Sequence, residues 1–346
     1  MNVISIFSGC GGLDLGFHQA GFNIIWANEY DKSIWDTYEF NHPHTHLDKR
    51  DIRKISPNDI PDCIGIIGGP PCQSWSEAGA QRGIEDNRGQ LFFDYIRILK
   101  EKKPLFFLAE NVSGILAKKH DKAFTNILYH FKEARYNVTY MLLNASDYLV
   151  PQDRKRVIII GYREDMGRIF EFPSVINNKL TLRNAIHDLK DIEAISIDSK
   201  VNKIHLIIPN HEYKEGSFSS IYMSRNRVRS WEEASYTIQA GARHAPIHPQ
   251  ANKMIWVGKD KWIFDPESPK PYRRLSVREC ARIQTFPDNF IFKYKYIGDG
   301  YKMIGNAVPV MLAKILADKI FMDIKQMKYP TRAVAHPPLI KERVGK

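Results

Sequence analysis

The chain has 346 residues, of which 43% are hydrophobic and 26% are charged. That balance is typical of a folded globular protein and excludes a disordered, collagen-like or disulfide-scaffold chain. Lys and Arg number 50 against 39 Asp and Glu, and the formal charge of +11 favours a polyanionic partner, either nucleic acid or an acidic membrane surface. The sequence contains no run of 18 apolar residues and no basic segment before its first apolar run, so we expect no membrane span, no export signal and a cytoplasmic protein.

The first 165 residues alternate between short apolar runs and amphipathic stretches. Runs rich in Ile, Val, Leu or Phe predict strands at 3–7, 24–27, 64–67, 105–109, 138–143 and 157–161. Amphipathic stretches predict helices at 34–40, 91–99 and 123–134. Because unbroken apolar runs are typical of strands covered on both faces, the alternation predicts an α/β fold with a mostly parallel sheet between layers of helices.

The alternation ends near residue 171. Residues 171–270 are rich in Asn, Ser, His, Pro and clustered Arg, which predicts a second, smaller and irregular domain with little regular helix. Helical patterns return at 275–284 and 309–327. We predict a first domain over 1–170, completed by 305–327, and a second domain over 171–300. A basic flexible tail is expected over 328–346.

A glycine-rich loop follows the first predicted strand and reads FSGCGGL, from Phe7 to Leu13. Glycines let the backbone approach a ligand closely, and the start of a helix presents free N–H groups. Glu29 follows the second strand, where a carboxylate suits a ribose diol. The spacing is not GxGxxG, which argues against a dinucleotide. A nucleoside site and a tight structural turn both remain open at this point.

The second motif follows the 64–67 run and reads GGPPCQSWS. Its two prolines stiffen the chain before Cys72 and place this thiol at the carboxyl end of a strand, where open α/β sheets build their sites. The four cysteines contain no CxxC pair and no zinc spacing, so we expect reduced thiols and no metal site. We interpret Cys72 as the candidate nucleophile, Cys10 as part of the glycine loop, and Cys63 and Cys280 as packing residues.

Two charged motifs accompany the next strands. Glu110 and Asn111 close the 105–109 run, and burial at a strand end would raise the pKa of the carboxyl group. A surface cap is the alternative for this motif. Arg154 and Arg156 precede the 157–161 run, and alternate arginines on an extended segment point to one side, which suits a phosphate or a base carbonyl. A solvated basic loop has the same pattern.

Taken in order, FSGxGG, GGPPCQ, ENV and QxRxR resemble the motifs of the cytosine-5 DNA methyltransferase family. Two further blocks, RRLSVRECAR at 273–282 and GNAVP at 305–309, match on the C-terminal side, and the resemblance runs from residue 4 to about 320. It implies a Rossmann-like S-adenosylmethionine-dependent methyltransferase sheet and a target-recognition domain within 171–300. The partners expected are S-adenosylmethionine and double-stranded DNA, with no membrane, and we expect a monomer.

The resemblance also assigns catalytic roles. Cys72 would add to carbon 6 of cytosine, and Glu110 would hold a proton at ring nitrogen 3. Arg156, with Arg154 beside it, would hold the carbonyl oxygen, and Asn111 would orient the loop of Cys72. The target base would be flipped out of the duplex.

The cofactor site implied by the resemblance combines the glycine loop with residues far along the chain. Phe7 would lie near the sulfonium, Glu29 would take the ribose hydroxyls, and Asp51 with Ile52 would border the adenine. The residues implied are Phe7, Gly9, Gly11, Gly12, Leu13, Glu29, Tyr30, Asp51, Ile52, Pro70, Leu91, Asn306 and Val308. The 74–90 segment, with three glycines and few apolar residues, predicts a mobile loop that closes on DNA.

Four arginines are candidates for DNA recognition. Arg225, Arg227 and Arg229 alternate along the chain, and Arg243 follows. Arg suits guanine through bidentate contact in the major groove, although phosphate contact is the alternative for each. The PNHEY and MSRNRVR blocks resemble GGCC-specific modification methylases of the HaeIII type. We therefore predict GGCC as the site, its internal cytosine as the target, and a cognate restriction endonuclease that shares the site without needing to bind this protein.

Three other functions share parts of the pattern. A tRNA cytosine-5 methyltransferase has the same motifs but a smaller recognition region than the roughly 100-residue Arg-rich insert here. A nucleotide-cofactor oxidoreductase is disfavoured by the missing GxGxxG and by PPCQ. A non-catalytic DNA-binding module would not need both Cys72 and Glu110.

Overall fold

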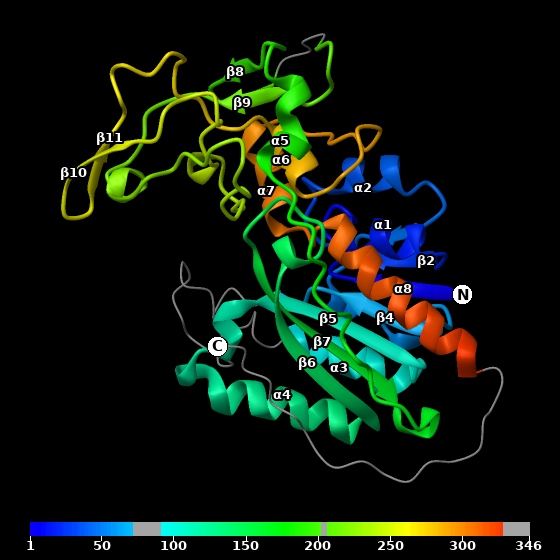
Figure 1. Ribbon diagram of the computed structural model, residues 1–346. Helices are drawn as coiled ribbons and strands as arrows, with labels where there is room; N and C mark the ends of the chain where they lie inside the picture. Colours follow the sequence, from blue (N-terminus) through cyan, green and yellow to red (C-terminus); the bar gives the residue numbers. More distant parts are fainter. Residues whose placement is uncertain (72–90, 202–205, 328–346) are drawn as a thin grey trace.

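A seven-stranded sheet forms the centre of the computed structural model, which describes residues 1–71, 91–201 and 206–327. Its strands are β1 (Asn2–Ile6), β2 (Asn23–Asn28), β3 (His46–Asp48), β4 (Gly65–Gly68), β5 (Phe106–Val112), β6 (Tyr136–Asn144) and β7 (Lys155–Arg163). They lie in the order β3-β2-β1-β4-β5-β7-β6 (Figure 1). Neighbours from β3 to β5 are parallel, and β7 runs antiparallel to β5 and β6. The predicted mostly parallel α/β fold is confirmed.

Helices cover both faces of this sheet. They are α1 (Gly12–Gln19), α2 (Trp35–Asn41), α3 (Leu91–Lys102), α4 (Asp121–Glu133) and α8 (Val310–Met327). Leu108 of β5 lies in a buried cluster with α1 and α8, whereas its neighbour Phe107 lies in a second cluster with α3 and α4 (Figure 1). Successive strand residues point to opposite faces, so a strand buried between two layers is apolar throughout.

Each of the six predicted strands overlaps an observed one, and β3 is the strand of this sheet that sequence reasoning missed. Its three residues, His46 to Asp48, contain one apolar side chain. That side chain, Leu47, packs into a small cluster with Ala27 and Tyr38. A strand this short at a sheet edge has no apolar run from which it could be predicted.

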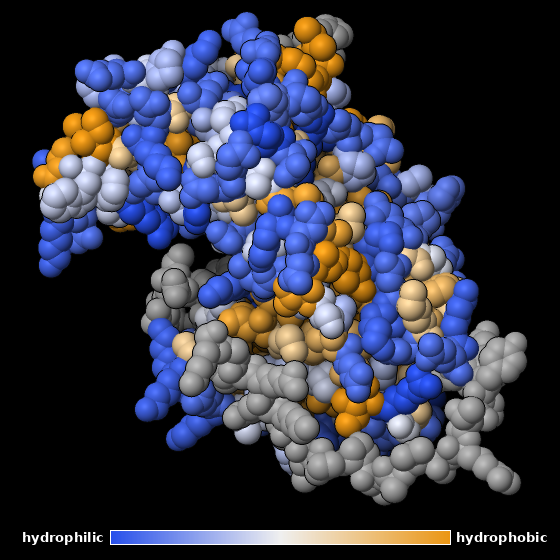
Figure 2. All heavy atoms as spheres, viewed as in Figure 1, coloured by the Kyte–Doolittle hydropathy of each residue, from blue (hydrophilic) through white to orange (hydrophobic). Residues whose placement is uncertain are grey.

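The irregular region beyond residue 171 contains short elements linked by long loops. They are α5 (Leu182–Ile186), β8 (Ile195–Ile197), β9 (Glu212–Lys214), β10 (Ile255–Gly258), β11 (Lys261–Ile263), α6 (Val277–Ile283) and α7 (Ile297–Asn306). The strands form two separate pairs, β8 with β9 and β10 with β11. Figure 1 shows these pairs beyond one end of the main sheet, and Figure 2 shows the molecule hollowed between the β10–β11 region and the sheet below.

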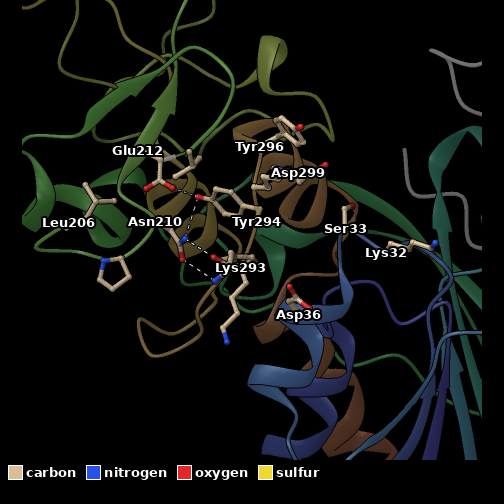
Figure 3. Close-up of a pocket in the computed structure, with 14 residues that line it drawn as sticks. Lys32, Ser33, Asp36, Leu206, Asn210, Glu212, Lys293, Tyr294, Tyr296 and Asp299 are labelled. Carbon is tan, nitrogen blue, oxygen red and sulfur yellow. Dashed lines mark hydrogen bonds between the residues drawn. The ribbon is translucent and has the colours of Figure 1, made fainter. Parts of the chain in front are cut away.

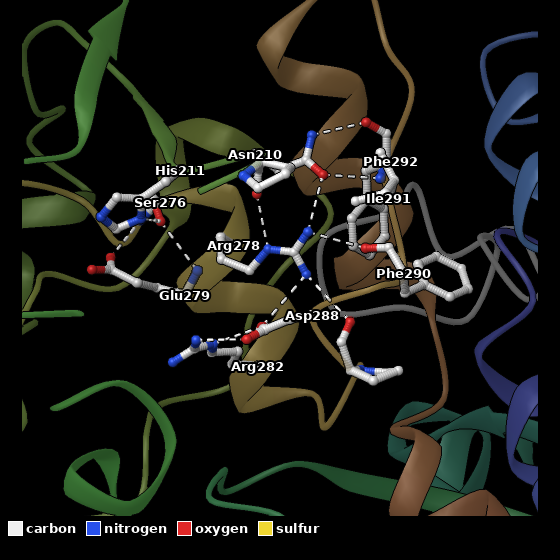
Figure 4. Close-up of polar contacts among 12 residues, drawn as sticks. Asn210, His211, Ser276, Arg278, Glu279, Arg282, Asp288, Phe290, Ile291 and Phe292 are labelled. Atoms are coloured by element: carbon white, nitrogen blue, oxygen red, sulfur yellow. Dashed lines mark hydrogen bonds and ion pairs between the residues drawn. The ribbon is translucent and has the colours of Figure 1, made fainter. Parts of the chain in front are cut away.

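A buried arginine on α6 connects the loops of this region (Figure 4). Arg278 has no exposed surface, and its guanidinium donates to the carbonyls of Pro209 at 2.9 Å and Phe290 at 3.1 Å. The neighbouring amide oxygen of Asn210 accepts from the backbone N–H of Phe292 at 2.9 Å. Backbone groups outside regular structure still need partners when they are buried, and here side chains supply them.

The last helix returns to the first part of the chain. A Cβ added at Gly16 of α1 would lie 2.5 Å from the Cβ of Ala313 and 2.7 Å from the carbonyl of Val310, so α1 and α8 cross in close contact. This crossing carries the C-terminal block back to the glycine loop. Among the described residues, no helix is both long and apolar enough to cross a membrane.

Candidate active site

The carboxyl ends of four parallel strands meet at one edge of the sheet. Ile6 of β1 is in register with Asn28 of β2 and Gly68 of β4, and Gly68 is in register with Ala109 of β5. The residues that follow these positions are Phe7, Glu29, Gly69 and Glu110. The fold thereby brings the glycine loop, the GGPP turn and the ENV motif together from separate parts of the sequence.

A buried ion pair lies at this edge. Glu110 is 8% exposed, and its Oε1 atom lies 2.8 Å from Nε of Arg156 on the adjacent strand β7. Burial lowers the pKa of Arg156, and the charge of Glu110 opposes that effect. A Cβ added at Gly69 would lie 3.1 Å from Oε2 of Glu110, so the glycine leaves room for the carboxylate beside the turn.

Asn111 fastens the same turn to β5. It is buried, and its Nδ2 atom donates to the carbonyl of Pro70 at 3.2 Å while its Oδ1 atom accepts from the backbone N–H of Val112 at 2.9 Å. Pro70 is two residues before Cys72. Cys72 itself and the predicted closing loop over 74–90 lie outside the described residues.

The structure corrects the expected place of Arg154. Its side chain has no exposed surface, and its guanidinium donates to the carbonyls of Ile238 at 3.1 Å and of Gly305 and Ala307, both at 2.9 Å. The donors of Arg154 are therefore directed to the backbone and not toward a base beside Arg156. The alternation of Arg154 and Arg156 in the sequence did not reveal this. It predicts the side to which the two side chains point, and it does not predict which carbonyls lie near Arg154.

The glycines of the loop after β1 differ in the space beside them. Phe7, Gly9 and Gly11 all have positive φ, at 57°, 56° and 88°. A Cβ added at Gly9 would meet nothing within 4 Å, whereas one at Gly12 would lie 2.7 Å from the carbonyl of Val308. The loop thus borders open space at Gly9 and packs at Gly12 against the block that precedes α8.

Glu29 lies directly on this loop. Its Oε2 atom accepts from the backbone N–H of Gly9 at 3.0 Å and its Oε1 atom from that of Asp31 at 2.8 Å, and burial raises its pKa. Asp51, in contrast, accepts from its neighbour Arg53, whose Nε lies 3.0 Å from Oδ1, and this pairing lowers the pKa of Asp51.

The remaining predicted cofactor residues differ in exposure. Leu13 and Ile52 are buried, and so is Pro70, whereas Leu91 is half-buried at the start of α3. Tyr30 and Asn306 are exposed. Because Leu13, Ile52 and Pro70 are buried, they can affect a bound cofactor only through backbone contacts or by shaping the wall of the site.

Sequence reasoning missed a buried support beneath the glycine loop. Asp14 has no exposed surface and accepts from the hydroxyls of Ser5 and Tyr38, both at 2.6 Å, and burial raises its pKa to about 6. The ring of His42 stacks on Tyr38, with 4.5 Å between centroids, and lies where a Cβ of Gly11 would be. The one available signal was an acidic residue within the apolar LDLGF stretch.

Two of the predicted recognition arginines are engaged within the protein. Arg227 donates from Nε to the carbonyl of Tyr222 at 2.7 Å. Arg229 forms ion pairs at 3.1 Å with Glu233 and with Asp153, the latter from the QDRKR segment. Arg229 therefore connects the irregular region to the strand that carries the buried ion pair.

The other two recognition arginines are exposed. Within the part of the chain that the structure describes, the guanidinium groups of Arg225 and Arg243 have no hydrogen-bond or ion-pair partner. Their segments lie side by side, because Val228 forms a β-bridge with Ile247. Two free guanidinium groups on adjacent segments can contact one ligand.

A separate hollow of about 850 Å³ lies between the start of α2 and the segment before α7 (Figure 3). Its lining includes Lys32 and Asp36 on one side and Asn210, Glu212 and Tyr294 on the other. Of the predicted site residues that the structure describes, none lines it. It is therefore distinct from the sheet edge that carries Glu110.

The parallel sheet with a glycine loop after β1, and polar groups at the carboxyl ends of its strands, defines an α/β methyltransferase fold. A candidate DNA modification methyltransferase encoded within an E. coli prophage has a similar solved structure, with a TM-score of 0.72 and 25% identity over 94% of this chain and 99% of that one. The model of the C-5 cytosine-specific DNA methylase family matches residues 1–322. The chain belongs to this family, and it is a DNA (cytosine-5-)-methyltransferase, which confirms the predicted enzyme class.

Two curated relatives are Type II methyltransferases. M.MthTI of Methanothermobacter thermautotrophicus is 60% identical over 325 residues, which cover 94% of this chain and 98% of the relative. M.NgoPII of Neisseria gonorrhoeae is 56% identical over 326 residues, which cover 92% of this chain and 95% of the relative. The similarity therefore spans both the sheet and the irregular region.

Proposed function

We propose that this enzyme transfers a methyl group from S-adenosylmethionine to carbon 5 of a flipped cytosine in duplex DNA. The observation that carries the proposal is the Glu110–Arg156 pair, with 2.8 Å between Oε1 and Nε, beside the turn that leads to Cys72. The enzyme acts as a monomer and marks the site of a cognate restriction endonuclease. The two Type II relatives support that role.

The chemistry we propose is covalent. The thiolate of Cys72 forms a bond to carbon 6 of the ring, and the proton held by Glu110 at nitrogen 3 neutralises the negative charge that the addition creates. Arg156 donates to the carbonyl oxygen of the base and keeps Glu110 oriented. Carbon 5 then accepts the methyl group and loses its proton to water. The thiolate leaves carbon 6, and the proton at nitrogen 3 returns to Glu110. Arg154 is too deeply buried for a base contact.

The residues around the glycine loop fit a nucleoside-type cofactor. Open space borders Gly9, and the carboxylate of Glu29 lies next to it. Glu29 would hold the ribose hydroxyls, Asp51 and Ile52 would border the adenine, and the block with Val308 would close the site. S-adenosylmethionine supplies the methyl group when it is bound.

Residues 171–300 form the target-recognition domain in this proposal, and GGCC is its site. The free guanidinium groups of Arg225 and Arg243 support direct contact with guanines. The donors of Arg227 and Arg229 are engaged within the protein, so these two residues hold the loops that present the recognition arginines. The internal cytosine of GGCC is the target.

A duplex that contains 5-fluorocytosine at the target tests the covalent step. With S-adenosylmethionine present, the enzyme should form an adduct that survives denaturation, because fluorine cannot leave carbon 5 as a proton does. Cys72→Ala should form none, and the matched control Cys63→Ala should form as much as the unaltered enzyme. An unaltered enzyme without an adduct would contradict the covalent scheme.

Glu110→Gln tests the proton at nitrogen 3. The amide keeps the shape of the side chain but cannot transfer a proton, so we expect kcat to fall by about 10²–10⁴-fold. The dissociation constant for DNA, measured by fluorescence anisotropy, should change little. A variant with unaltered kcat would remove Glu110 from the mechanism.

Digestion of methylated plasmid by a panel of restriction enzymes tests the site. Protection confined to GGCC is expected. Protection at another sequence would overturn the assignment of Arg225 and Arg243 and leave the chemistry at Glu110 in place.

A further inference from the structure

Arg154 occupies an unusual electrostatic position. Its side chain has no exposed surface, and among the described residues it forms no ion pair. Burial lowers its pKa well below the usual value, and the charge of nearby Arg156 acts in the same direction. A buried guanidinium without a carboxylate partner is costly unless its donors find acceptors. Here three backbone carbonyls accept from Nη1 and Nη2, while Nε has no partner among the described residues.

The three carbonyls belong to two segments that serve different parts of the proposed site. Ile238 begins the stretch that leads to Arg243, one of the free recognition arginines. Gly305 and Ala307 flank Asn306 in the block that packs on the glycine loop. Arg154 itself is two residues before Arg156. A single side chain, directly before β7 and its Arg156, therefore touches the recognition segment and the cofactor block.

The segments fit tightly around this side chain. A Cβ added at Gly305 would lie 2.3 Å from the carbonyl carbon of Gln239 and 2.4 Å from the nitrogen of Ala240, so the two backbones are in direct contact. Gln152 accepts at Oε1 from the backbone N–H of Ile238 at 3.0 Å. Such close backbone contact restricts movement of the recognition segment relative to the cofactor block.

The number and direction of donors explain why Arg is needed at this position. The guanidinium is planar and presents its N–H groups in a fixed fork, whereas the ammonium of Lys is a compact charge on a flexible stem. The fork of Arg154 reaches one carbonyl from Nη1 and two from Nη2. Lys at this position could retain the charge but could not hold both segments in one geometry.

We propose that Arg154 is a positioning residue that locks the recognition segment and the cofactor block to the strand of Arg156, so that DNA and cofactor are bound in one fixed relation. The role rests on the proposed function, since it assumes that Arg243 faces DNA and that the glycine loop faces the cofactor. It replaces the direct contact with cytosine that the sequence pattern suggested for Arg154.

Arg154→Lys tests the role, with Lys155→Ala as the matched control on an exposed neighbour. We expect the dissociation constants for S-adenosylhomocysteine and for the enzyme's own duplex site to rise together in Arg154→Lys, with kcat/KM lower by up to about 100-fold. The preference for that site over duplexes with one changed base pair should also fall, while kcat changes much less than kcat/KM. Lys155→Ala should match the unaltered enzyme.

Two results would overturn the positioning role: unaltered dissociation constants, or a fall in kcat alone, which would place Arg154 at the reacting atoms. Should Arg154→Lys fail to fold by circular dichroism, Gly305→Ala tests the same contact, because its methyl group would separate 305 from 239–240 and displace the carbonyls that Arg154 binds, while Arg154 itself is not substituted. Weaker binding of both ligands supports the role, and unaltered binding overturns it.

The site used in this test is found first, by bisulfite sequencing of plasmid methylated by the unaltered enzyme. A site other than GGCC would contradict the recognition proposal while leaving the Arg154 experiment valid on the observed site. Ser276→Ala, which removes a helix cap on α6 away from Arg154, controls for a general loss of stability. This variant should lower the melting temperature without changing the preference for the site.

Discussion

The parallel sheet and the irregular region beyond residue 171 are stabilised in different ways. In the sheet, strands such as β5 are buried almost throughout, and their side chains enter two large apolar clusters. In the irregular region, α5, α6 and α7 share an apolar cluster of similar size, whereas the cluster around Tyr222 and Val228, among the loops, is small. Charged side chains are buried beside these loops as well: Arg274 is 3% exposed, and Arg278 and Glu279 have no exposed surface.

The difference follows from where the backbone hydrogen bonds go. Strands of the sheet pair with each other, whereas the loops of the irregular region leave carbonyls without a regular partner. Arginine has five donors and can satisfy several carbonyls at once. Arg274 donates to the carbonyls of Lys214, Gly216 and Ser217 at 2.9 to 3.2 Å. The loops around Tyr222 and Val228 are thus held by polar contacts of buried arginines in addition to their small apolar cluster.

Removal of a buried charge should lower the stability of the irregular region more than any other change considered. Glu279 pairs with Arg273 at 2.7 Å and has a pKa lowered to about 2, so Glu279→Ala leaves a buried guanidinium without its partner. We expect the free energy of unfolding to fall by about 3–5 kcal/mol, measured by urea denaturation. The exposed Glu267→Ala is the control and should change it by less than about 0.5 kcal/mol. Equal effects of the two variants would show that the buried pair does not hold the region.

The pH dependence of stability should reveal a buried neutral histidine. His248 has no exposed surface, its Nδ1 accepts from the backbone N–H of Gln250 at 3.2 Å, and burial lowers its pKa to about 4. It therefore remains neutral beside Glu279, although Nε2 lies only 3.4 Å from that carboxylate.

The unfolded chain binds a proton at His248 below about pH 6.5, and the folded chain does so only below about pH 4. The stability contributed by His248 is thus present above pH 6.5 and is lost as the pH falls toward 4. The difference in unfolding free energy between the unaltered protein and His248→Gln should change across this window by up to about 1.4 kcal/mol per pH unit. The exposed His244→Gln is the control, and a difference that does not depend on pH would contradict a neutral His248.

A small reduction in the volume of a buried side chain in the sheet should lower the stability of the protein only modestly. Ile159 of β7 is completely buried, and Ile159→Val removes one methylene group without altering any polar contact. We expect the free energy of unfolding to fall by about 0.5–1.5 kcal/mol, with little change in DNA affinity. An effect as large as that of Glu279→Ala would remove the contrast between the two regions.

The sheet could be predicted because its information is local. The apolar run at Phe107 and Leu108 indicates a strand buried on both faces without reference to any other segment. Much of the site followed from it, because Glu29 and Glu110 stand directly after such runs and parallel strands end at one edge. The support at Asp14 could not be predicted in the same way, since its partners Ser5 and Tyr38 come from different elements.

The amino-acid sequence by itself determined the α/β class, the order of the motifs and the family to which the chain belongs, because periodic apolar runs and short motifs are properties of neighbouring residues. Only the tertiary structure decided the partners of the arginines. Arg154 and Arg156 are two residues apart, yet one donates to carbonyls more than 80 residues away and the other pairs with Glu110. A guanidinium takes whichever acceptors surround it, and those are set by how distant segments pack.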